Sequence, residues 1–251
     1  MRDLNAIRFE PHGPAGIGLV EGAKIDPDEL TAGEPVQRSH NYFTDDTSTV
    51  KAGVWDCTPM TTKLAPYDVN EFMHVLEGTV TIIDQKGHEE TIHAGASFVI
   101  PKGMPCIWKQ TEYMRKFYFL FNDLSGAAPE DPARLKVLRI DPNVDLAPLE
   151  QQDVSRYRGG VPTQHIHTCF SDRTGQMTAG VWDTTEMHTR PLPFPRNELM
   201  HILSGSVAIT NGDGVSQTFH KGDTFFVPEG MSCQWDSEGY VRKIYCLFQP
   251  K

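Results

Sequence analysis

The chain has 251 residues and a formal net charge of −10 at neutral pH, with 23 Lys and Arg against 33 Asp and Glu. This acidic balance argues against a nucleic-acid backbone or an anionic membrane surface as a partner. The longest dense apolar run spans only residues 117–121, so no transmembrane segment is predicted. The first residues, MRDLNAIRFEPHG, lack the apolar segment of a signal peptide, and we expect a cytoplasmic protein.

Short strands separated by turn residues are predicted along the first half of the sequence. Segments rich in Val, Ile, Phe, Thr and aromatic residues are typical of strands and occur, in chain order, at 49–56, 71–75, 79–83, 97–100 and 116–121. Glycine and proline lie between them, at Gly78, Gly95 and Pro101, and supply turns. Since no segment here has a sustained period of 3.6 residues, an all-β sandwich or barrel is predicted.

The second half of the chain repeats the first. The sequence AGVWD at 52–56 recurs at 179–183, an offset of 127 residues. With that offset and no gap, residues 37–121 align with 164–248, and 38 of the 85 pairs are identical. A gap-free match of this length indicates a tandem duplication. We therefore predict two domains, 1–127 and 128–251, each with its own lead-in strands.

Two spaced motifs occur once in each repeat. The pattern E-x6-G begins at Glu71 and is followed by G-x5-P-x-G from Gly95, and the same pair begins at Glu198 and Gly222. This pattern resembles the two sequence motifs of the cupin superfamily over about two thirds of the chain. The resemblance implies a bicupin, that is, two antiparallel β-barrels of jelly-roll (RmlC-like) type in tandem.

The branch of the superfamily can be narrowed. The segments EFMHVLEG, PKGMPCIW and RKFY are similar to the branch that includes ureidoglycine aminohydrolase and ethanolamine-utilisation proteins. This similarity implies a small nitrogenous or carboxylate metabolite as the ligand.

The resemblance also implies a metal site, most of whose ligands this sequence lacks. Metal-binding cupins carry His-x-His four and six residues before the motif glutamate, and a third histidine three residues after the last motif glycine. Those positions hold Tyr67, Ala65 and Cys106 in the first repeat and Phe194, Leu192 and Cys233 in the second. Because a transition metal normally needs about four ligands, no cofactor is expected. If a divalent metal does bind, the candidate ligands are His40, Glu71, Cys106, His167, Glu198 and Cys233.

Strand alternation predicts which side chains line each barrel, because every second residue of a strand faces the same side. The predicted lining is Ala65, Tyr67, Glu71, Met73, Cys106 and Trp108 in the first repeat, and Leu192, Phe194, Glu198, Met200, Cys233 and Trp235 in the second. Each set describes a mostly apolar cavity with one central carboxylate.

The central glutamate needs a partner, because an isolated buried carboxylate is costly. The candidates are the pairs 115–116 and 242–243, Arg-Lys in each repeat. The pair either fixes the barrel or leaves the carboxylate to act as a general base or ligand anchor. Tyr67 lies within reach of Glu71, whereas Phe194 has no hydroxyl. Glu71 and Tyr67 are therefore the catalytic candidates, and the second barrel is interpreted as a structural copy.

Three functions stay open. The first is metal-independent acid/base chemistry on a small polar metabolite in the N-terminal barrel, with Glu71 as base and Tyr67 as acid or orienting group. The second is a non-catalytic binding or sensor protein, and the third is a metal-dependent aminohydrolase-like cupin with atypical ligands. The residues do not decide whether the protein is an enzyme. The expected partners are a small-molecule ligand and a second copy of the chain, since paired barrels with edge strands suggest a homodimer, as the resemblance to cupins also implies.

Overall fold

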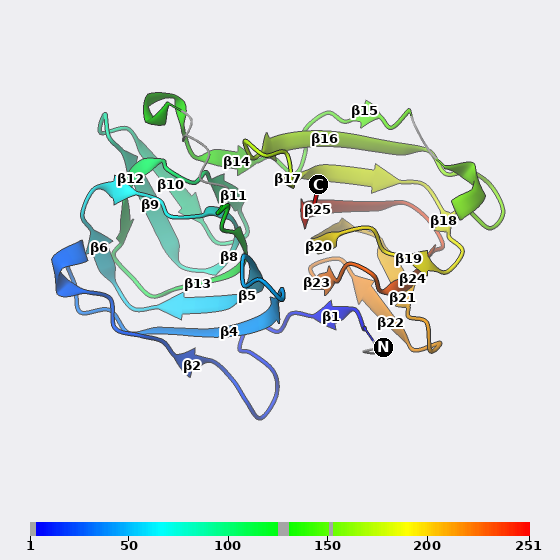
Figure 1. Cartoon of the computed structure of the whole chain (residues 1–251), viewed down its shortest axis with the longest axis horizontal. Helices are drawn as coiled ribbons and strands as arrows, with labels where there is room; N and C mark the ends of the chain where they lie inside the picture. Colours follow the sequence, from blue (N-terminus) through cyan, green and yellow to red (C-terminus); the bar gives the residue numbers. More distant parts are fainter. Residues whose placement is uncertain (1–3, 125–130, 151–152) are drawn as a thin grey trace. The chain divides into compact units, whose positions relative to one another are not determined.

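The computed structural model describes residues 4–124, 131–150 and 153–251. The chain divides into two compact units, one formed by residues up to Arg8 together with Ile140–Lys251, the other by Phe9–Arg139. Each unit is a jelly-roll barrel made of two antiparallel sheets, as the duplication predicts (Figure 1). Within the described ranges, no helix has the length and hydrophobicity needed to cross a membrane.

The N-terminal barrel contains a seven-stranded and a six-stranded sheet. The first sheet has, in spatial order, β14 (Leu138–Ile140), β11 (Ser97–Ile100), β8 (Asn70–Glu77), β13 (Met114–Phe121), β5 (Val50–Cys57), β4 (Gln37–Thr44) and β2 (Val20–Glu21). The second has β10 (Glu89–His93), β9 (Thr79–Asp84), β12 (Pro105–Gln110), β6 (Met60–Thr62) and β3 (Leu30–Ala32), with β7 (Ala65–Pro66) paired to β12. Two 3-10 helices, Pro27–Glu29 and Pro132–Arg134, begin after aspartate caps.

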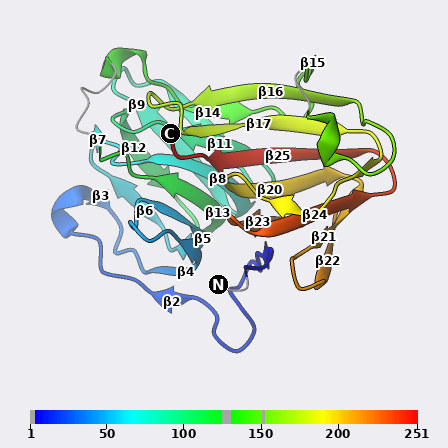
Figure 2. The same ribbon diagram turned by 45° about the vertical axis from the view of Figure 1, so that its right-hand side comes forward.

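The C-terminal barrel repeats this arrangement with a seven-stranded and a five-stranded sheet (Figure 2). The first has β1 (Ile7–Arg8), β23 (Thr224–Val227), β20 (Asn197–Ser204), β25 (Val241–Phe248), β17 (Met177–Thr184), β16 (Gln164–Ser171) and β15 (Ala147–Pro148). The second has β18 (Met187–His188), β24 (Ser232–Ser237), β21 (Ser206–Thr210) and β22 (Ser216–His220), with β19 (Leu192–Pro193) paired to β24. A third 3-10 helix spans Val154–Arg156.

The lead-in strands are arranged differently from the prediction that each copy carries its own. Strand β1, at the start of the chain, pairs with β23 of the C-terminal barrel, where Arg8 forms an ion pair with Asp223 at 2.6 Å. The two units accordingly divide between Arg139 and Ile140, whereas the predicted boundary at 127 falls within 125–130, outside the described residues. The gap-free alignment begins only at residue 37, so it carried no information about the pairing of earlier segments.

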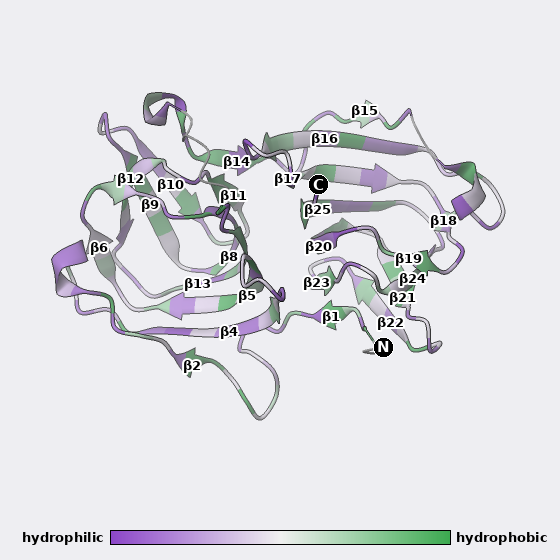
Figure 3. Cartoon of the chain, viewed as in Figure 1, coloured by the Kyte–Doolittle hydropathy of each residue, from purple (hydrophilic) through white to green (hydrophobic). Residues whose placement is uncertain are grey.

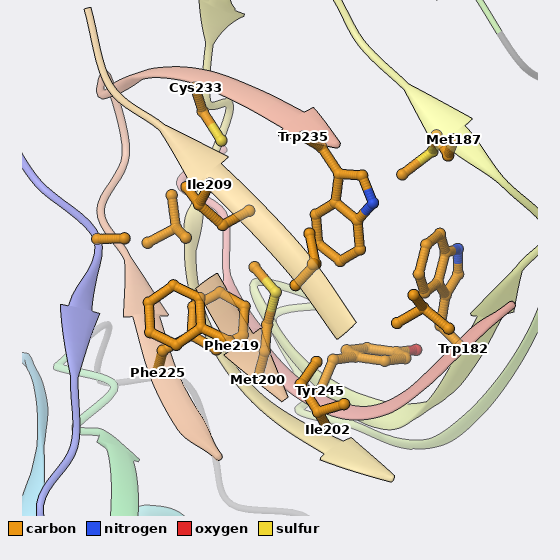
Figure 4. Close-up of a cluster of buried hydrophobic side chains, with 14 of the residues drawn as sticks. Trp182, Met187, Met200, Ile202, Ile209, Phe219, Phe225, Cys233, Trp235 and Tyr245 are labelled. Carbon is orange, nitrogen blue, oxygen red and sulfur yellow. The ribbon is translucent and has the colours of Figure 1, made fainter. Parts of the chain in front are cut away.

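Each barrel has its core where the inner faces of its two sheets meet. Strands β12 and β24 show strict alternation of buried and half-buried residues, as expected for strands with one face inward. Hydrophobic and hydrophilic residues accordingly occur together along single strands (Figure 3). In the C-terminal core, Trp182 and Trp235 meet edge to face with their centroids 5.7 Å apart, close to Met200 and Tyr245 (Figure 4).

Gly78, in the turn between β8 and β9, is expected to tolerate substitution poorly. Its φ of 78° favours glycine, and a Cβ would lie 2.2 Å from the carbonyl oxygen of Tyr113. Gly87 has a similar φ of 83° but open space around it. We expect Gly78→Ala to lower the free energy of unfolding by about 1–3 kcal/mol more than Gly87→Ala, measured by urea denaturation. Equal losses would show that backbone conformation, and not crowding, decides both sites.

Candidate functional site

A buried ion pair lies at the centre of the N-terminal barrel. Strand β8 supplies Glu71 and Met73, and the neighbouring strand β13 supplies Lys116. The Nζ atom of Lys116 lies 2.9 Å from Oε1 of Glu71 and 2.9 Å from Sδ of Met73. Tyr67 donates its hydroxyl hydrogen to the other carboxylate oxygen, Oε2. The three side chains form a continuous hydrogen-bonded chain, Tyr67–Glu71–Lys116, whose lysine and glutamate are 5% and 7% exposed.

Two indole rings flank the ammonium group of this pair. The Nζ atom of Lys116 lies 4.9 Å from the ring centroid of Trp55, on β5, and 4.7 Å from that of Trp108, on β12. The two rings meet edge to face at 6.1 Å. Cation–π attraction therefore helps to compensate the lysine for the water it loses on burial.

The C-terminal barrel repeats the pair but changes its third member. The Nζ atom of Lys243 lies 2.8 Å from Oε1 of Glu198, 3.1 Å from Sδ of Met200, and within 4.7 and 5.1 Å of the Trp182 and Trp235 centroids. Phe194 replaces Tyr67 and cannot donate a hydrogen bond. Instead, Nε of Arg196 donates to Oε2 of Glu198 at 2.8 Å. This carboxylate is thus held between two cations.

The two carboxylates consequently differ in electrostatic surroundings. Burial by itself would raise the pKa of Glu198, but the charges of Lys243 and Arg196 outweigh burial and lower that pKa to about 2. Burial also lowers the pKa of Lys243, although Glu198 opposes the shift. In the N-terminal barrel, burial reinforced by the negative charge of Glu71 holds the pKa of Tyr67 well above its ordinary range. The Tyr67 hydroxyl therefore keeps its proton at neutral pH and acts as a donor.

Each ion pair lines a cavity of small-molecule size. The N-terminal cavity has a volume of about 420 Å³ and the C-terminal one of about 360 Å³. The N-terminal lining comprises Ser39, Asn41, Lys51, Trp55, Met60, Thr62, Tyr67, Glu71, Trp108, Lys116, Tyr118 and Leu120. A few polar groups on a largely apolar wall are typical of sites that orient a small ligand.

The structure brings most of the predicted pocket residues together. Leu192, Phe194, Glu198, Met200, Cys233 and Trp235 all line the C-terminal cavity. In the N-terminal barrel Tyr67, Glu71 and Trp108 line the cavity, and Met73 touches the Lys116 ammonium. Cys106 is buried but is not part of the cavity lining. Ala65 is exposed outside the cavity, because the two-residue strand β7 ends at Pro66 and the alternation counted back from Glu71 does not extend through it.

The donor sets around the two glutamates do not fit a transition metal. A lysine ammonium already lies on each carboxylate and would repel a metal cation. Burial raises the pKa of Cys106 to about 11 and that of Cys233 to about 12, so both are protonated thiols at neutral pH and each would have to release a proton to bind a metal.

The two candidate histidines lie away from the cavities. His40 packs edge to face on Tyr42 with ring centroids 4.7 Å apart, whereas the next residues along β4, Ser39 and Asn41, line the N-terminal cavity. His167 is exposed on β16, and the cavity receives Gln164 and Ile166 from that strand. Strand alternation therefore turns both histidines outward.

The structure decides between the two basic residues of each Arg-Lys pair. The lysines bind the central glutamates, whereas Arg115 lies 3.9 Å from Asp56 and Arg242 lies 3.3 Å from Asp183, both buried aspartates of the neighbouring strand. Sequence reasoning missed Arg196, although a signal was present. It lies two residues before Glu198, the spacing that places two side chains on one face of an extended chain.

A known family matches the chain twice, once in each repeat. The family model described as the EutQ-like cupin domain matches residues 44–118 and again 171–245. A protein of unknown function of the DUF861 family from Pseudomonas syringae pv. tomato has a similar structure, with a TM-score of 0.79 and 24% identity over 97% of this chain and 99% of that one.

Two further solved structures share the fold at lower identity. A cupin 2 conserved barrel domain protein from Leptotrichia buccalis has a TM-score of 0.57 and 11% identity over 90% of this chain and 100% of that one. The Ylba protein from E. coli has a TM-score of 0.57 and 13% identity over 99% and 92%. No curated protein matches the sequence.

Proposed function

Since the chain belongs to the EutQ-like cupin family in both of its repeats, we propose that its N-terminal barrel binds a small polar metabolite and transforms it by metal-independent acid/base chemistry. The observation that carries this proposal is the hydrogen-bonded chain Tyr67–Glu71–Lys116 on the wall of a cavity of about 420 Å³. It combines a carboxylate, a neutral hydroxyl donor and an ammonium group in one place, and these are the parts that proton transfer requires.

The roles follow from the charge of each group. Glu71 accepts a proton from the ligand as general base. Lys116 holds the carboxylate by one oxygen and places a positive charge beside any anion that develops on the ligand. Tyr67 holds the second oxygen and, once Glu71 has gained a proton, can donate its hydroxyl hydrogen to the ligand while it takes up the proton of Glu71, which returns both groups to their starting states. The indole rings of Trp55 and Trp108 form flat apolar parts of the wall of the same cavity.

The lining favours a small nitrogenous or carboxylate metabolite. Ser39, Asn41 and Thr62 offer short polar groups, and Lys51 adds a second ammonium to the wall. Glu71 can accept a hydrogen bond from an amine or amide group of the ligand. Lys51 can donate a hydrogen bond to a carboxylate group of the ligand. Membership of the EutQ-like cupin family supports this class of ligand by analogy.

Two conservative variants test the proposal. A thermal-shift screen of small amines, ureides and hydroxy acids identifies ligands, and their conversion is then followed by NMR. We expect Glu71→Gln to lower turnover about 100-fold or more and Tyr67→Phe to lower it about 10- to 100-fold, since each removes a proton-transfer group and keeps the shape. Glu89→Gln, exposed on β10, is the control and should turn over at the rate of the unaltered protein. Full activity of Glu71→Gln on every converted ligand would sink the proposal.

A non-catalytic binding protein is the second candidate, and one observation favours it. Both oxygens of Glu71 already have partners within the barrel, so the carboxylate is satisfied without a ligand. In that case ligands would raise the melting temperature, and NMR in D2O would show neither conversion nor exchange of ligand hydrogens.

A further inference from the structure

Two of the paired positions at which the two repeats differ lie next to the central carboxylate. Tyr67 and Val69 of the first repeat are replaced by Phe194 and Arg196 of the second. A guanidinium therefore takes over the hydrogen bond to Oε2 that a neutral hydroxyl makes in the N-terminal barrel. Because Lys243 already pairs with Glu198, the exchange adds a positive charge that the carboxylate does not need for neutrality.

The other charged residues of this cavity also give it an excess of positive charge. Its lining contains four cationic side chains, Arg156, Arg190, Arg196 and Lys243, against two carboxylates, Asp153 and Glu198. Within the described residues, the Arg190 guanidinium donates one hydrogen bond, from Nε to the backbone oxygen of Ser155 at 3.2 Å. In the same parts of the chain Arg156 makes no salt bridge, although its charge, after hydrogen bonds from Ser155, helps to lower the pKa of Asp153. The cavity thus carries a surplus of two positive charges in a chain whose net charge is −10.

Most of the rest of the wall is apolar. Tyr157, Ile166, Trp182, Leu192, Phe194 and Leu247 contribute aromatic and aliphatic surface. Within the described chain, Arg196 uses Nε for Glu198 and has its two terminal amino groups free of any carboxylate. A planar guanidinium with free amino groups binds a carboxylate through two parallel hydrogen bonds. We expect the apolar part of the wall to disfavour a fully hydrated anion such as inorganic phosphate.

We propose that the C-terminal barrel is a second binding site, which holds a small organic carboxylate with an apolar body. Arg196 binds the carboxylate, Arg156 and Arg190 supply further positive charge, and the aromatic wall takes the apolar body. This site is separate from the acid/base site of the N-terminal barrel and needs no turnover to be detected.

Calorimetric titration of the full chain with benzoate tests this site, with benzamide as the neutral isostere and inorganic phosphate as the small anion. We expect benzoate to bind more tightly than either. Arg196→Val, which installs the residue of the first repeat, should weaken benzoate binding about 10- to 100-fold. Arg134→Val, at an exposed arginine of the N-terminal unit, is the control and should bind as the unaltered chain does.

The double variant Phe194→Tyr with Arg196→Val is a control for loss of affinity through misfolding of the single variant. It restores the hydroxyl–carboxylate bond found in the N-terminal barrel, so Glu198 keeps two donors, and it too should lose benzoate affinity. The site would be refuted by benzamide binding as tightly as benzoate, by phosphate binding more tightly, or by no benzoate binding at millimolar concentration. Unchanged benzoate affinity in the folded double variant would place the binding elsewhere and equally refute it.

Discussion

Lys116→Met is expected to lower the free energy of unfolding of the N-terminal barrel by about 3–5 kcal/mol. The substitution keeps the length and much of the apolar surface of the side chain, so packing is largely preserved. It leaves Glu71 buried with one hydrogen bond, from Tyr67, and no compensating cation. Urea denaturation followed by tryptophan fluorescence measures the loss, because Trp55 and Trp108 face the substituted group.

Two further variants separate the charge effect from a packing defect. Lys116→Met combined with Glu71→Gln removes both charges and keeps an acceptor for Tyr67, so most of the lost stability should return. Lys243→Met, at the paired position, should cost at least about 1 kcal/mol less than Lys116→Met, because Arg196 still neutralises Glu198. If both lysine variants lose equally and the double variant recovers nothing, packing and not charge holds the site together.

The internal repeat shows which part of the site the two barrels share. The five residues that surround the ammonium are identical between the copies: tryptophan at 55 and 182, glutamate at 71 and 198, methionine at 73 and 200, tryptophan at 108 and 235, and lysine at 116 and 243. The residues that adjust the carboxylate differ, at Tyr67 against Phe194 and at Val69 against Arg196. The lysine therefore belongs to the shared framework, and we expect the differing positions to distinguish the ligands of the two cavities.

Most of the fold could be predicted from the sequence, because its central strands carry strong apolar patterns. The strands expected at 71–75, 79–83, 97–100 and 116–121 lie within or match β8, β9, β11 and β13. The sequence signal failed for strands with little buried surface. In strand β10, Glu89–His93, Ile92 is the only buried residue. Strand β4 has no buried residue and is largely polar, so its sequence lacks an apolar pattern. Both still form, since pairing with neighbours satisfies their backbone groups.

The central glutamate could be predicted from its motif, whereas its partner could not. Arg115 and Lys116 are adjacent, so one faces the cavity and the other does not, but the choice depends on register. The register of the pairing between β13 and β8 shifts between these two residues, and no sequence pattern predicts this β-bulge. Similarly, the placement of strand β1 in the C-terminal barrel depends on which sheet edge is free, a tertiary property that local sequence does not encode.

Acid is expected to destabilise the C-terminal barrel through Glu198. The folded-state pKa of this residue is lowered to about 2 from an ordinary 4.5, so the unfolded chain binds the proton more readily than the folded one. The resulting stabilisation, about 3 kcal/mol, is fully present above pH 5, declines as the pH falls below 4.5 and is lost near pH 2. Urea denaturation between pH 7 and pH 3 measures the decline.

The contribution of Glu198 can be separated from that of other acids by Arg196→Val. Several exposed or half-buried aspartates also have lowered pKa values, among them Asp223 and Asp236, and they contribute equally to the variant and the unaltered chain. With one of its two cations removed, Glu198 keeps a smaller pKa shift, so the variant should be less stable at pH 7 but lose less stability on acidification. The two curves should therefore converge towards pH 3. Parallel curves would mean that Arg196 stabilises the barrel by packing alone, and that the guanidinium is not electrostatically coupled to the buried carboxylate.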